Sequence, residues 1–342
     1  MEKRVAEWDI IKGICIIGIV FSHAGHALFW FSYFYLFGFY FVSGAVYRDK
    51  PFLKFAISKI RRMYIPFVFS NLLAKLMCFF LYKLNIYREY SWDGYIVSLL
   101  EFNLREGVMA PSWFLFPLFC ISFLFYFMKR IIKNNISLFL ITFWIMIIIV
   151  HYRKILSVYV WNNCAIILNL ALGLFVYTCG YIYNHNCQIK GYIETSKYGF
   201  DFFIISLIIL GEAKYYWNYH LDLRAGVISS GKWMIATYIA GICFLLYSSK
   251  IILIHSAFLK RILTYIGKNS MWIMLFHILC FNIVTIIGIY LLEEISVVPW
   301  SNALYGEWYY EYANILVGLT LPLLIKKLIE ILKAKIYRWH SI

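Results

Sequence analysis

The stretch Arg4-Val-Ala-Glu-Trp-Asp9-Ile-Ile-Lys12-Gly13-Ile-Cys-Ile-Ile-Gly-Ile-Val-Phe-Ser-His23-Ala-Gly-His26 decides how the rest of the chain is interpreted. It opens with charges, continues as an apolar run, and then places two histidines where an ordinary membrane helix has hydrocarbon. As a helix, the residues from Asp9 to His23 rise by about 21 Å, so His23 would lie more than halfway across a bilayer. An ionisable side chain at that depth is costly and indicates a functional site.

The composition predicts an integral membrane protein. Hydrophobic residues make up 63% of the 342-residue chain and charged residues only 14%. A soluble domain is about 45–50% apolar, so this chain has too little polar surface to cover itself. The N-terminus carries Glu2, Glu7 and Asp9 and lacks a small-residue cleavage site, so we expect the first helix to be retained rather than removed as a signal peptide. The eight cysteines lack CxxC spacing and are interpreted as core-filling thiols.

The hydrophobic pattern predicts an all-α bundle of about ten transmembrane helices that forms one domain over residues 1–342. The apolar runs are 10–28, 30–47, 66–84, 113–128, 136–150, 162–183, 199–211, 233–247, 271–292 and 313–332. With ten spans, 23 of the 32 Lys and Arg residues fall on the side of the two termini. Positive residues favour the cytoplasmic face, so both termini are predicted to be cytoplasmic. This bias also explains the net charge of +15 without nucleic acid as a partner.

The non-spanning segments 85–112, 212–232 and 293–312 fall on the opposite side and are rich in Trp and Tyr. Two interpretations stay open for them. They form an aromatic belt at the membrane interface, or they form a platform of flat rings on which a sugar stacks.

His23 and His26 are three residues apart and so lie near one face of a helix. A buried structural histidine bonded to a carbonyl or hydroxyl is the simpler explanation. The alternative is a general base, because imidazole titrates near neutrality and can take a proton from a hydroxyl. The charges at the base of the same helix favour the second interpretation for His23, and His26 is placed nearer the rim.

A basic segment runs from Arg48 to Pro66 and includes the adjacent pair Arg61 and Arg62. Such a segment can lie on anionic lipid headgroups. It can also bind a phosphorylated cosubstrate, since paired guanidinium groups offer planar forks to phosphate.

Two further stretches carry polar residues at the ends of apolar runs. Trp113 follows Pro111-Ser112 at the mouth of the fourth run, and His277 lies seven residues, or two helical turns, after Ser270 in the ninth. The chain contains no phosphate-binding glycine loop, no H-E-x-x-H and no G-x-S-x-G. We therefore expect no metal and no ATP-driven machine.

Taken together, these stretches resemble the membrane acyltransferase-3 family, in particular its branch of sugar O-acetylases similar to fucose 4-O-acetylase. The family opens with Arg, four residues, Asp, two residues, Lys/Arg-Gly and then a His about ten residues on. The matching features here are Arg4, Asp9, Lys12-Gly13 and His23; the aromatic run ending in Ser43-Gly44; Arg61-Arg62 before Pro66; Trp113-Phe-Leu; and Ser270 with His277. The one departure is Tyr33-Phe-Tyr-Leu36, where the branch often has His-Met-Pro-Leu.

The resemblance implies an acyltransferase of the bacterial inner membrane. Its donor would be acetyl-CoA from the cytoplasm, and its acceptor a hydroxyl of a surface polysaccharide or lipid-linked sugar on the far side, with membrane lipids as its surroundings. We expect catalytic roles for His23 and Asp9. Donor binding is assigned to Arg61, Arg62, Lys12 and Arg48, and acceptor binding to His26, Ser43, Trp113 and His277.

Two other functions remain open from the sequence. A glycolipid transporter or flippase would use the same buried polar helices without making a bond, although inverted repeats are common in transporters and none is visible here. A catalytically idle membrane sensor is disfavoured because His23, Arg61 and Arg62 are all present.

Overall fold

The computed structural model describes residues 5–25, 34–83, 93–100, 107–155, 164–188, 190–191, 199–217, 219–292 and 308–339. The chain divides into two compact units, each built from three separate segments. The first unit comprises Met1–Gly18, Trp30–Lys59 and Phe114–Lys268, and the second comprises Ile19–Phe29, Ile60–Trp113 and Asn269–Ile342. The prediction of a single domain is not tested by this division.

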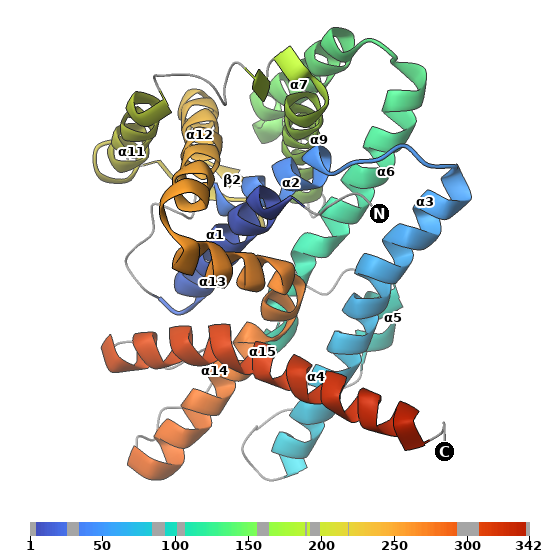
Figure 1. Cartoon of the computed structure of the whole chain (residues 1–342), viewed down its shortest axis with the longest axis vertical. Helices are drawn as coiled ribbons and strands as arrows, with labels where there is room; N and C mark the ends of the chain where they lie inside the picture. The colour runs from blue at the N-terminus through green and yellow to red at the C-terminus, as the bar shows by residue number, and fades with distance from the viewer. Residues whose placement is uncertain are drawn as a thin grey trace. The chain divides into compact units, whose positions relative to one another are not determined.

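The described residues are almost entirely helical (Figure 1). α1 (Ala6–His23) contributes to both units. The first unit also contains α2 (Tyr35–Ala45), α3 (Phe52–Lys59), α6 (Leu115–Ile131), α7 (Asn135–His151), α9 (Cys164–His185), α11 (Gly199–Tyr215), α12 (Gly231–His255) and α13 (Ala257–Lys268). The second contains the π-helical turn η2 (Ile60–Tyr64), α4 (Ile65–Lys83), α5 (Tyr95–Leu100), the 3₁₀ segment η3 (Gly107–Phe114), α14 (Ser270–Leu292) and α15 (Trp308–Trp339). The only described strands, β1 (Leu221–Asp222) and β2 (Val227–Ile228), form a short antiparallel pair.

Each of the ten predicted apolar runs overlaps one of these helices. Five described helical stretches are long and apolar enough to cross a membrane: Phe52–Phe80, Pro111–Ile131, Ala165–His185, Gly231–His255 and Ser270–Gly288. The chain is therefore a helical membrane protein, as predicted. The count of ten spans and the cytoplasmic position of both termini stay predictions.

Glycines allow a close helix approach in the first unit, between α2 and α9. A Cβ on Gly44 would collide with the carbonyl of Tyr177, and a Cβ on Gly180 would collide with that of Phe41. The two contacts are reciprocal, so the helices run antiparallel with their backbones touching. Small residues allow this approach where lipid supplies no hydrophobic driving force between helices.

α1 and α13 pack in the same way (Figure 1). Gly13 faces the carbonyl of Leu263, and Gly267 faces that of Asp9. This crossing explains physically why a glycine follows Lys12 in the opening pattern, because any side chain there would separate the two helices.

Candidate active site

α1 ends at the histidine that the sequence singles out. Gly25 takes a left-handed conformation with φ 81°, which only glycine adopts without strain, and glycine in this conformation typically terminates helices. The predicted span 10–28 is therefore a helix that stops at His23. His23 lies in its last turn, where the helix dipole stabilises a positive charge by about 0.3–1 kcal/mol. His26 lies outside the described residues.

His23 contacts His277 of α14, a residue 254 positions away in the sequence. Nδ1 of His23 lies 2.8 Å from Nε2 of His277, and the two rings are stacked with their centroids 5.0 Å apart. Both residues belong to the second unit. His277 is fully buried, with 0% of its surface exposed, whereas His23 is half-buried. We call these two residues the histidine pair.

The hydrogen bonds of the histidine pair fix its tautomers. Nδ1 of His277 lies 2.8 Å from the carbonyl oxygen of Ile273. A carbonyl can only accept, so Nδ1 of His277 carries a proton, and Nε2 of the neutral ring is then an acceptor. Nδ1 of His23 must therefore donate to it, which leaves the lone pair of neutral His23 on Nε2. This is the protonation state that a general base requires.

Arg61 and Arg62 lie in η2, directly before α4, and both side chains are exposed. A π-helical turn is rare and is found frequently at functional sites, because it re-aims side chains inside an otherwise regular helix. The backbone thus departs from α-geometry at the arginines that the sequence assigns to the donor. The arginines and the histidine pair belong to the same unit.

Asp9 and Lys12 lie in the first unit and form an ion pair across one turn of α1. The Lys12 ammonium is 2.7 Å from a carboxylate oxygen of Asp9, whose side chain is 1% exposed. The backbone carbonyl of Asp9 faces Gly267 of α13. These contacts hold Asp9 at the crossing of α1 and α13. The predicted catalytic role of Asp9 and the predicted donor role of Lys12 stay predictions.

The remaining assigned residues are distributed between the units. Ser43 is half-buried on α2, and Arg48 is exposed after it, both in the first unit. Trp113 is half-buried in η3 of the second unit. Among the described residues that the sequence assigns, His23 and His277 are far apart in the chain and in direct contact.

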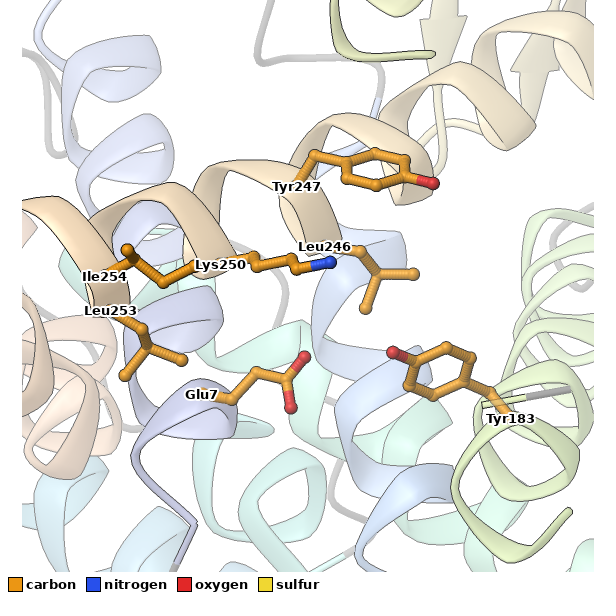
Figure 2. Close-up of a pocket in the computed structure, with 7 residues that line it drawn as sticks. All are labelled: Glu7, Tyr183, Leu246, Tyr247, Lys250, Leu253 and Ile254. Carbon is orange, nitrogen blue, oxygen red and sulfur yellow. The ribbon is translucent and has the colours of Figure 1, made fainter. Parts of the chain in front are cut away.

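A pocket of about 230 Å³ lies within the first unit. Figure 2 shows that the carboxylate of Glu7, the ammonium of Lys250 and the hydroxyl of Tyr183 point toward one another, and that Tyr247 also lines the pocket. None of the residues assigned from the sequence lines this pocket, so it is not the predicted active site.

Sequence reasoning missed several buried polar residues. In the first unit, Tyr40 donates to Asn169 over 2.6 Å. In the second unit, Asn282 and Asn314 are buried on α14 and α15. The sequence signal for the asparagines was a carboxamide inside an apolar run. Burial of such a polar group in a membrane costs free energy and indicates a functional role.

The fold is that of a helical membrane protein with a hydrogen-bonded pair of histidines among its helices. A family model described as an acyltransferase domain matches residues 5–325. The chain therefore belongs to the membrane acyltransferase-3 family, as the sequence predicted, and is a membrane acyltransferase. No curated protein and no solved structure matches it.

Proposed function

We propose that this protein is an O-acetyltransferase of a bacterial inner membrane, similar to the fucose 4-O-acetylase branch of its family. It moves the acetyl group of cytoplasmic acetyl-CoA to a hydroxyl of an extracytoplasmic glycan or glycolipid. The observation that carries this proposal is the hydrogen-bonded histidine pair, whose tautomers leave a lone pair on Nε2 of His23.

In the proposed reaction, Nε2 of His23 accepts the proton of the acceptor hydroxyl. The hydroxyl oxygen attacks the thioester carbonyl, the C–S bond breaks, and the proton passes from His23 to the departing CoA thiolate. The products are an acetyl ester and CoA. The imidazolium that forms in between is stabilised by the C-terminal end of α1 and by its bond to Nε2 of His277. His277 acts as a positioning residue, because it holds His23 in the reactive tautomer.

The donor is assigned to the basic end of the same unit. The phosphates of CoA would pair with Arg61 and Arg62 on their π-helical turn, where planar guanidinium groups can bind phosphate through two bonds each. The sequence also assigns Arg48 and Lys12, both in the first unit, to donor binding. The neutral pantetheine arm would then carry the thioester from the basic turn toward His23.

The experiment uses membranes that contain the full-length protein, acetyl-CoA labelled in its acetyl group, and unacetylated surface glycan from cells that lack the protein. We expect release of CoA and a glycan mass increase of one acetyl group, both dependent on this protein. Movement of glycan across the membrane with no acetyl transfer would identify a flippase instead and contradict the proposal.

A further inference from the structure

α14 and α15 pack against each other (Figure 1). A Cβ on Gly318 of α15 would overlap the ring of Phe281 on α14, so the α15 backbone lies directly on that ring. Farther along α15, Lys326 donates a hydrogen bond to Asn269, just before α14 begins. These two contacts fix the opposite directions of the helices.

Asn314 lies one turn before Gly318 and therefore on the same face, toward α14. It is 0% exposed, and within the described part of the chain neither its amide nitrogen nor its carbonyl oxygen has a hydrogen-bond partner. Asn282, which follows Phe281, donates to the carbonyl of Ile278 over 3.0 Å, but its own oxygen is buried without a partner there. Buried polar atoms are nearly always bonded, so packing alone does not explain these carboxamides.

Along α14 and α15, the carboxamides and the contact between Lys326 and Asn269 lie on opposite sides of His277. The ring of Phe281 contacts that of His277, with the centroids 5.6 Å apart. Asn314 is one turn beyond Phe281's partner Gly318, on the side away from Lys326. A donor that enters at the end of Lys326 would thus reach His277 before it reaches the carboxamides.

The chemistry of this segment fits neutral hydroxyl groups. Neither α14 nor residues 314–325 of α15 contains a charged side chain. A carboxamide both donates and accepts hydrogen bonds, as a sugar hydroxyl does. Tyr309 and Tyr312 are exposed in the first turns of α15, where they offer ring faces to a pyranose.

We propose that Asn314 and Asn282 bind the ring hydroxyls of the acceptor, a neutral pyranose, and so place its reacting hydroxyl at His23. This inference rests on the proposed O-acetyltransferase function and adds the residues that select the acceptor. It assigns the aromatic rings at the start of α15 to the path by which the sugar enters.

The test replaces Asn314 by leucine (Asn314→Leu) in the full-length protein and measures three quantities with labelled acetyl-CoA and unacetylated surface glycan. We expect acceptor kcat/KM to fall about 10-fold or more, while the KM for acetyl-CoA stays within about twofold. The melting temperature should stay level or rise, because leucine removes a buried amide without partners. Asn282→Leu should show a smaller loss of the same kind.

Thr285→Val is the matched control, because the hydroxyl of this buried residue donates to its own helix at the carbonyl of Phe281 over 3.3 Å. It should leave the kinetics unchanged. Unchanged transfer in both asparagine variants would overturn the inference, as would a raised KM for acetyl-CoA, which would place the donor there. A lower melting temperature with activity lost only in proportion to folded protein would show a packing role. If the wild type transfers no acetyl group at all, the proposed function fails instead.

Discussion

The α2–α9 pair and the α14–α15 pair are both antiparallel helix contacts made through glycine, but they differ in what each glycine touches. Gly44 and Gly180 contact backbone carbonyls, and the buried hydroxyl of nearby Tyr40 donates a hydrogen bond to Asn169. Gly318 instead accommodates the ring of Phe281, and Asn314 beside it keeps two polar atoms without partners in the described chain. Within the described residues, the first pair leaves one buried hydroxyl, that of Tyr177, without a hydrogen-bond partner, whereas the second leaves three carboxamide atoms of Asn282 and Asn314 without one.

This difference predicts that substitutions in the first and the second unit have two different kinds of effect. Changes at the α2–α9 contact should lower the amount of folded protein and leave each folded molecule active. Changes at the histidine pair should lower the rate per molecule and leave the unfolding free energy nearly unchanged. The predictions below test that separation.

The largest effect is expected for His23→Ala. Removal of a general base costs about 10²–10⁴-fold in rate, and we expect kcat for acetyl transfer to fall by roughly 10³-fold at unchanged melting temperature. His255→Ala provides the control, because this exposed histidine lies at the end of α12. A His23→Ala protein with wild-type kcat would remove His23 from the mechanism.

Gly180→Ala is expected to have the largest effect on folding. The added Cβ would collide with the backbone carbonyl of Phe41, which cannot rotate away, and overpacking of this kind costs about 1–3 kcal/mol. Gly211→Ala is the matched control on α11, where no atom lies within 4 Å of the added Cβ. It should be neutral or slightly stabilising. The measurement is the melting temperature and the kcat per folded molecule; equal stability of the two variants would contradict the backbone contact.

His277 allows the positioning role to be separated from simple packing. His277→Leu should lower kcat by about 10–100-fold, a typical cost of losing the group that orients a reactive histidine. His277→Gln keeps an acceptor near the position of Nε2, so it should recover much of that loss. Similar kcat values in both variants would mean that the bond to His23 does not set the tautomer.

Much of the fold was predictable from the sequence, because long apolar runs in a membrane protein have few alternatives to helix. Each run overlaps a described helix, and the family followed from the opening pattern together with the later matching stretches. The end of α1 at His23 was readable from Gly25 but was missed, since hydrophobicity alone extends the run to residue 28.

The candidate site was predictable only in part. His23 and His277 were both singled out, but no local periodicity links residues 254 positions apart, so their contact required the fold. The π-helical turn at Arg61 and Arg62 also has no signal in hydropathy. Asn282 and Asn314 were not predicted, because a single asparagine in an apolar run does not by itself indicate a site. Only the fold shows that their amide atoms lack hydrogen-bond partners in the described chain.

The smallest effect is expected at the donor arginines. Replacement of both Arg61 and Arg62 by alanine should raise the KM for acetyl-CoA by about 10-fold and leave kcat close to the wild-type value. The reason is that pairing with phosphate stabilises the bound donor and the transition state equally. Lys54→Ala removes an exposed charge from α3, which precedes η2 in the chain, and should raise this KM much less.

A donor without nucleotide phosphates sharpens this test. S-acetylpantetheine should be a poor substrate for the wild-type protein and equally poor for the double variant, because the arginines then have nothing to bind. If the variant loses activity with S-acetylpantetheine as well, the arginines act on the helix or on the chemistry rather than on phosphate. In that case the rare backbone geometry at η2 would need an explanation within the fold itself.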